Sequence, residues 1–107
     1  MNINHLLMIF LFFIFISCEY NVEETDEINC DDEVSFINTI KPIIDGNCLE
    51  CHNGTQFPDL RTFQGISDNA ERVKNETFSR RMPLDGSLTT EEIEAIFCWV
   101  ESGALNN

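Results

Sequence analysis

The segment Cys48-Leu49-Glu50-Cys51-His52 constrains this chain more than any other part of the sequence. Two thiols at this spacing lie about one helical turn apart, and an imidazole directly follows the second thiol. Each thiol can therefore form a thioether with one vinyl group of a haem, and His52 then lies beneath the ring as a ligand of the iron. A fold that carries this motif must leave room for a large, flat and mostly apolar group.

Residues 1–17 resemble a removable export segment, in which an apolar run from Leu6 to Ile16 precedes Ser17 and Cys18. The run is shorter than the roughly 20 residues that span a bilayer as a helix, and it fits the core of a signal peptide. The junction is similar to a bacterial lipobox, which is cleaved before a cysteine that is then acylated. We therefore expect a lipoprotein signal peptide and a lipid anchor at Cys18. The alternative is ordinary cleavage that leaves Cys18 as a thiol.

Cleavage after residue 17 would leave His52 as the one histidine and Met82 as the one methionine of the mature chain. No second histidine of the same chain could then bind the iron, so the thioether of Met82 is the expected sixth ligand. Its polar context, Arg81-Met82-Pro83, lies outside any amphipathic stripe and argues against a core-filling role. Lys41 or Lys74 would be a rarer sixth ligand.

Two cysteines, Cys30 and Cys98, belong neither to the motif nor to the anchor. Because an exported protein lives in an oxidising compartment, a disulfide between them is the simplest expectation. On the expected last helix Cys98 lies off the apolar stripe, on the side of Glu94 and Glu101, so we expect it to face outward toward a bonding partner. The bond would staple the N-terminal segment onto that helix. Free thiols and an intermolecular bond are the alternatives.

Two other uses of a C-x-x-C pair fit the sequence less well. A thioredoxin-like pair belongs to a βαβ pattern, and no strand-like alternation of useful length occurs here. A structural zinc site needs four ligands, whereas Cys48, Cys51 and His52 offer three. Cys30 and Cys98 could complete such a site, but export disfavours it.

The mature chain divides into an acidic segment and a folded domain. Residues 18–33 are rich in Asp and Glu and contain neither Lys nor Arg, which predicts an extended, solvated tether. The folded domain is expected over residues 34–107. Its first helix carries helically spaced apolar residues from Phe36 to Ile44 and is kinked or restarted at Pro42.

Two further helices are expected beyond the motif. Thr62 is the expected N-cap of a helix that carries Phe63, Ile66, Ala70 and Val73. The last helix begins with the capping box Thr89-Thr90-Glu91-Glu92 and ends at Gly103, and its apolar stripe is Ile93, Ile96, Phe97 and Val100. The pattern predicts a small all-α domain of three short helices. Such a domain has little core of its own, and a large macrocycle would supply the missing interior.

The order of these parts resembles a monohaem class I-type cytochrome c domain in a small exported bacterial lipoprotein. The resemblance covers residues 34–107 and rests on segments 40–44, 48–52, 58–60, 81–84 and 88–104. It implies a three-helix fold wrapped around one covalent haem c. Cys48 and Cys51 would form the thioethers, His52 would be the proximal ligand and Met82 the distal one. It further implies that a backbone carbonyl near Pro58 orients the His52 ring.

An iron with His and Met ligands has no open position for a substrate, so we expect an electron carrier and not an enzyme. The alternatives are a haem-based gas sensor, in which Met82 dissociates, and an accessory haem subunit or domain of a larger redox enzyme complex. The expected location is the cell envelope, at the outer membrane or the periplasmic face. The outer membrane is favoured because Glu19, and not Asp, follows Cys18.

The formal net charge of −13 bears on partners. Nucleic acid and anionic membrane surfaces are poor partners for so acidic a chain, so membrane contact is expected through the lipid anchor only. The expected partner is a redox protein with a basic docking patch, met by a monomer or by a subunit of a redox complex. The alternative is that the acidity only keeps the domain soluble. Arg80 and Arg81, beside Met82, are candidates to contact the haem propionates or that partner.

Overall fold

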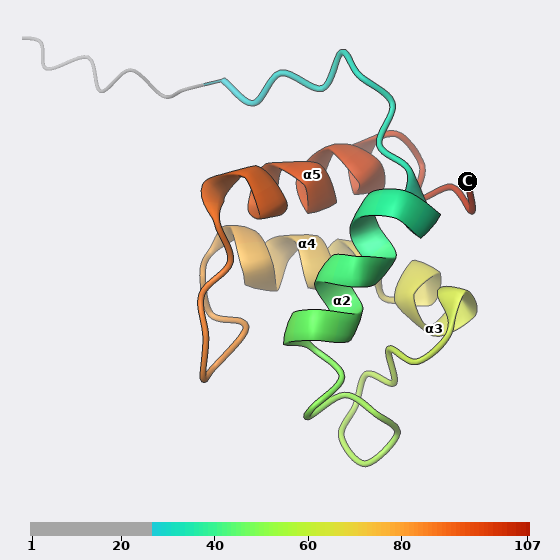
Figure 1. Cartoon of the computed structure of the whole chain (residues 1–107), viewed down its shortest axis with the longest axis vertical. Helices are drawn as coiled ribbons and strands as arrows, with labels where there is room; N and C mark the ends of the chain where they lie inside the picture. The colour runs from blue at the N-terminus through green and yellow to red at the C-terminus, as the bar shows by residue number, and fades with distance from the viewer. Residues whose placement is uncertain (1–26) are drawn as a thin grey trace, which may run out of the picture.

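The computed structural model describes residues 27–107, which form helices and no strand (Figure 1). The elements are a π-helical turn η1 (Phe36–Ile40) and the α-helices α2 (Lys41–Asn47), α3 (Phe63–Asp68), α4 (Ala70–Phe78) and α5 (Thr90–Glu101). The predicted all-α class is confirmed for this part of the chain. No helix in it is both long and apolar enough to cross a membrane. The expected signal peptide, the anchor Cys18 and most of the acidic segment lie outside the described residues.

The first predicted helix consists of η1 and α2, which follow one another without a loop. The Ser35 hydroxyl accepts a hydrogen bond from the Asn38 amide at 3.1 Å and caps the first turn. Pro42 lies at the start of α2, where a missing N–H costs nothing because the first amides of a helix have no partner within it. The expected restart at Pro42 therefore corresponds to the change from η1 to α2 at Lys41.

The second predicted helix is wrong as a single element, because the chain forms α3 and α4 there. Thr62 caps α3 as predicted, and its hydroxyl accepts from the Gly65 amide at 3.1 Å. The break falls at Asn69, whose side-chain amide donates to the Gly65 carbonyl at 2.8 Å. Asn side chains favour such local bonds over continued helix. The domain thus has four α-helices and η1, where the sequence predicted three helices.

The last helix, α5, follows the prediction at both ends. Thr89 accepts a hydrogen bond from the Glu92 amide at 3.1 Å, and the Glu92 carboxylate accepts one from the Thr89 amide at 2.8 Å. Beyond the helix Gly103 has a φ of +105°, which glycine adopts without steric cost. Three members of the predicted stripe are buried, while Phe97 is half-buried and packs on Phe78 with their ring centroids 5.5 Å apart.

The core lies where α5 crosses η1 and α4. Trp99 is 1% exposed, and its ring lies 5.5 Å from that of Phe36, which in turn meets Phe63 edge-on at 4.9 Å. The Trp99 indole N–H donates to the Leu105 carbonyl at 2.9 Å, so its one polar atom is satisfied. The other fully buried large side chains are Ile40, Ile44 and Ile96.

Both ends of the domain are tied to the core. Cys30 forms a disulfide with Cys98 across a sequence separation of 68 residues, and this bond fixes the segment before η1 on α5. The expectation that Cys98 faces outward is wrong, since it is 5% exposed. At the other end, Asn107 accepts from the Phe36 amide through its side chain at 2.7 Å and from the Ile37 amide through its backbone carbonyl at 3.0 Å.

Removal of the disulfide should destabilise the domain substantially, because the bond closes a long loop. In urea denaturation, the double variant Cys30→Ser/Cys98→Ala should lose about 2–5 kcal/mol of unfolding free energy. A thiol reductant should lower the wild-type stability by a similar amount and leave the double variant unchanged. Equal stability of the wild type and the variant under oxidising conditions would contradict the bond.

Candidate functional site

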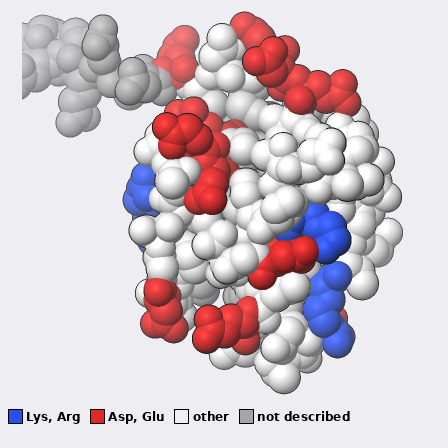
Figure 2. All heavy atoms as spheres, in the orientation of Figure 1, with Lys and Arg blue, Asp and Glu red and all other residues white. Residues whose placement is uncertain are grey.

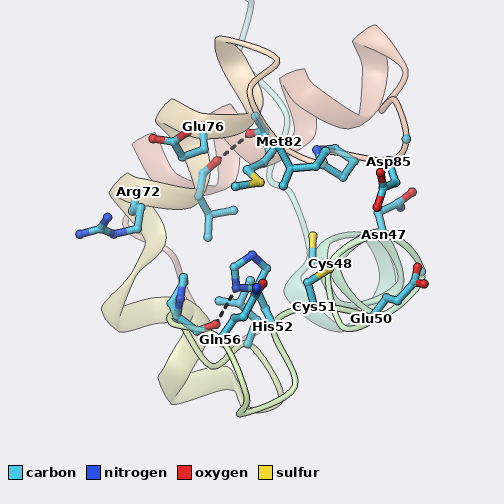
Figure 3. Close-up of a pocket in the computed structure, with 18 of the residues that line it drawn as sticks. Asn47, Cys48, Glu50, Cys51, His52, Gln56, Arg72, Glu76, Met82 and Asp85 are labelled. Atoms are coloured by element: carbon cyan, nitrogen blue, oxygen red, sulfur yellow. Dashed lines mark hydrogen bonds between the residues drawn. The ribbon is translucent and has the colours of Figure 1, made fainter.

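A cavity of about 420 Å³ lies between the loop that follows α2, helix α4 and the loop 82–86. Its lining includes four residues that the sequence selected: Cys48, Cys51, His52 and Met82. Figure 3 shows His52 and Met82 projecting into it from opposite sides, with Cys48 and Cys51 together at one end. Buried Leu60, Val73 and Thr77 also line it, so part of its wall is the domain core.

The backbone of the motif forms a compact turn that extends α2. The amide of Cys48 donates to the Ile44 carbonyl at 2.9 Å, and the amides of Cys51 and His52 donate to the Cys48 carbonyl at 3.3 and 2.9 Å. These are helix-like bonds between residues three and four apart. They bring both thiols and the imidazole to one side of the cavity.

The imidazole of His52 is fixed by a hydrogen bond between its Nδ1 and the backbone carbonyl of Pro58, at 3.0 Å. A carbonyl oxygen can only accept, so Nδ1 carries the proton and Nε2 of the neutral ring keeps a free lone pair. Such a bond to a backbone carbonyl is a common device for orienting a histidine that binds a metal through its other nitrogen. The acceptor is the carbonyl that the resemblance to cytochrome c indicates.

Helix α3 packs closely against the segment that supplies this carbonyl. The Leu60 amide donates to the His52 carbonyl at 2.9 Å and closes the loop between them. A Cβ added to Gly65 would lie 2.2 Å from the Asp59 carbonyl oxygen, so α3 can approach the loop only because residue 65 has no side chain. Gly65 thereby fixes the position of the Pro58 carbonyl indirectly.

Met82 enters the cavity from the loop after α4. Its backbone amide donates to the Glu76 carbonyl at 3.1 Å, and the Arg81 amide donates to the same oxygen at 3.0 Å. Arg80 lies between α4 and these two residues and adopts a left-handed φ of +58°, which turns the chain sharply. The Arg80 guanidinium donates to the Leu88 carbonyl at 3.1 Å and so ties the two ends of the Met82 loop together.

The Cys48 thiol is partly buried and free of any disulfide. Burial raises its pKa to about 11, so the thiol stays protonated at neutral pH. Cys48 is the C-cap of α2, so it lacks the helix N-terminus that often lowers the pKa of a reactive thiol. No group of three or more His, Cys, Asp or Glu side chains within residues 27–107 is arranged to hold a metal ion.

Four cationic residues that the sequence considered do not line the cavity. Lys41 pairs with Asp45, and Lys74 pairs with Glu71 and Glu101. Arg80 is bound to the backbone of the Met82 loop, and Arg81 pairs with Glu76. None of the four therefore faces the space between His52 and Met82.

The sequence analysis overlooked Arg72, which does line the cavity. It lies on α4 next to Val73 and one turn before Glu76, and both of these also line the cavity. A helical projection of residues 70–78 could have found it, but the analysis treated this stretch only as a source of core residues. The acidic lining residues are Glu50, Glu76 and Asp85. On the face shown in Figure 2, acidic side chains form several separate groups.

Comparison of the chain with protein-family models, with curated proteins and with solved structures finds no match. The arguments for a function therefore rest on the geometry of the cavity and on the sequence motif.

A Gly65→Ala substitution should destabilise the domain by about 1–3 kcal/mol, because the new methyl group must displace the Asp59 carbonyl. The matched control is Gly46→Ala in α2, where a Cβ meets nothing within 4 Å. That control should be neutral or stabilising by about 0.4–1 kcal/mol. Urea denaturation of both variants tests the difference, and equal stability of the two would contradict the close approach of α3.

The Cys48 thiol should be slow to alkylate in the folded protein. At pH 8 its thiolate fraction is about 100-fold below that of an ordinary thiol, because burial raises its pKa from 9.0 to about 11. Its alkylation rate should still rise with pH up to about pH 11. In a Cys51→Ser variant, mass spectrometry of iodoacetamide labelling should show slow reaction in buffer and fast reaction in urea. Equal rates in the two conditions would exclude the raised pKa.

Proposed function

We propose that this domain binds one haem c and serves as a single-electron carrier. The observation that carries the proposal is the hydrogen bond between His52 Nδ1 and the Pro58 carbonyl, at 3.0 Å. It leaves Nε2 as the free ligand atom of a ring that projects into the cavity opposite Met82 (Figure 3). An imidazole held in this way is prepared to bind a metal at its other nitrogen.

The donor set and the shape of the cavity fit a haem. Both thiols of the motif lie at one end, where thioethers to two vinyl groups would form. The imidazole and the Met82 thioether approach from opposite sides, as the two axial ligands of one iron must. A volume of about 420 Å³ lies within the range of cofactor sites, and the buried lining residues Leu60 and Val73 suit an apolar macrocycle.

When bound, a haem would supply an iron that alternates between Fe(III) and Fe(II). The chain's own residues would then keep both axial positions filled. His52 is held by the Pro58 carbonyl, and Met82 is held through its backbone amide by the Glu76 carbonyl. With both positions filled there is no place for a substrate to bind the iron, so electron transfer is favoured over catalysis. The Met82 thioether would raise the reduction potential relative to a second imidazole.

We also propose that the domain is attached to the cell envelope by a lipid at Cys18, after removal of residues 1–17. The junction Ser17-Cys18 supports this part, and it lies outside the described residues. The expected partner is a redox protein with a basic docking patch. Glu50 and Asp85 support that choice, because both are exposed and line the cavity.

A Met82→Ala variant tests the proposed ligand set. Protein matured with a c-type haem assembly system should carry a covalent low-spin haem with a Met–Fe(III) charge-transfer band in the near infrared. The variant should lose that band, bind CO when reduced and have a lower reduction potential, because the thioether stabilises Fe(II). Ser87→Ala, an exposed residue of the same loop, is the matched control and should behave as the wild type.

Each other outcome has a definite meaning. If the wild type binds CO readily, the gas-sensor function would be supported in place of electron transfer. Retention of the near-infrared band in Met82→Ala would exclude Met82 as a ligand. Failure of the wild type to form a covalent haem would overturn the whole proposal.

A further inference from the structure

The two ends of the cavity differ in chemistry. Cys48 and Cys51 lie at one end, and Arg72 lies on the opposite side (Figure 3). The charged residues in the lining are three acids and Arg72, which is its one cation within residues 27–107. Arg72 is an exposed residue, and it lies at the end of the cavity remote from the two thiols (Figure 3).

Arg72 also differs from the other cations in its contacts. The chain has six Lys and Arg residues, and all of them are described. Five are bound to acceptors of the protein: Lys41, Arg61, Lys74, Arg80 and Arg81. The Arg72 side chain has neither an ion pair nor a hydrogen bond to any residue of the described range. Its neighbour Glu76, one turn further along α4, is paired with Arg81 and is therefore already bound.

The position of the Arg72 guanidinium is nevertheless restricted by a contact with an aromatic ring. It lies over the ring of Phe57, with its carbon 5.3 Å from the ring centroid. Phe57 is 73% exposed and also lines the cavity, so its ring lies at the solvent-exposed edge of the cavity. A cation–π contact of this kind restricts the guanidinium, and its N–H donors are bound to no other residue within 27–107.

The covalent structure of haem supplies the acceptor. Its two vinyl groups and its two propionates lie on opposite edges of the macrocycle. If the vinyl groups bind Cys48 and Cys51, the propionate edge is directed away from those residues, toward the side of the cavity on which Arg72 lies. The unpaired cation and the expected carboxylates therefore occur at the same end.

We propose that Arg72, in cation–π contact with Phe57, binds a haem propionate and so positions the anionic edge of the haem. This inference rests on the proposed function and adds a residue that the motif does not indicate. A guanidinium presents two parallel N–H donors that match a carboxylate, which makes Arg better suited to this role than Lys. It replaces Arg80 and Arg81, the sequence-based candidates for the propionates, since neither lines the cavity.

The bond should affect the iron through charge. An uncompensated carboxylate near the iron favours Fe(III), whereas a cation bound to that carboxylate offsets its effect. Loss of the Arg72 charge should therefore lower the reduction potential of the bound haem. The acids that face the same cavity, Glu50, Glu76 and Asp85, act in the opposite sense and are unchanged by the substitution.

The test compares Arg72→Gln, Arg72→Lys and the charge-matched control Lys41→Gln, each matured with its haem. Lys41 pairs with Asp45 on the exposed side of α2 and does not line the cavity. Resonance Raman spectra report propionate hydrogen bonding through the propionate bending mode, and voltammetry reports the potential. Arg72→Gln should shift that mode to lower frequency and lower the potential. Arg72→Lys should shift the mode but keep the potential near the wild-type value, and Lys41→Gln should change neither.

The failure of this inference differs from the failure of the proposed function. A wild-type protein without covalent haem would overturn both. Haem-loaded Arg72→Gln with an unchanged bending mode would overturn the role of Arg72 alone. The same holds if Lys41→Gln lowers the potential as much as Arg72→Gln does. Arg72→Lys keeps the charge, so it supplies an independent result if Arg72→Gln does not fold.

Discussion

The hydrogen bond between His52 Nδ1 and the Pro58 carbonyl determines what the rest of the cavity can do. A histidine free to rotate could present either nitrogen, or turn its ring away from the cavity. Because the acceptor is a carbonyl, the proton is confined to Nδ1 and the lone pair to Nε2. The bond also ties the motif to a segment six residues further along the chain. Helix α3 approaches that segment closely at Gly65, and this packing helps to keep the segment in place.

The two sides of the cavity are secured by different means. On the His52 side, the ring itself is bound, and α3 approaches the surrounding loop closely at Gly65. On the Met82 side, only the backbone is bound, through Glu76 and the Arg80 guanidinium. The Met82 thioether has rotatable bonds and no such restraint on its side chain. Of the two proposed ligands, Met82 is therefore the one whose side chain can move, whereas the His52 ring is held in place.

The sequence predicted those features that depend on local chemistry. The capping box at Thr89, the N-cap at Thr62 and the terminating Gly103 involve neighbours within a few residues, and all three are confirmed. The break at Asn69 was missed because the apolar spacing runs straight through it, while a side-chain bond to Gly65 decides the structure. Arg72 was missed for a different reason. Its place at the cavity depends on how α4 lies relative to the loop that carries His52 and Pro58. No local sequence pattern encodes that tertiary arrangement.

The Cys30–Cys98 bond has a mechanical consequence. It joins the segment before η1 to the C-terminal part of α5, and within the described residues no part of α5 lines the cavity. Tension applied to the chain ahead of Cys30 would pass through the disulfide into α5 and from there into the packed core around Trp99. The loops that carry His52 and Met82 are not joined to the disulfide or to α5 by a covalent cross-link. A domain held at its N-terminal side is thus attached through a helix that does not itself line the cavity.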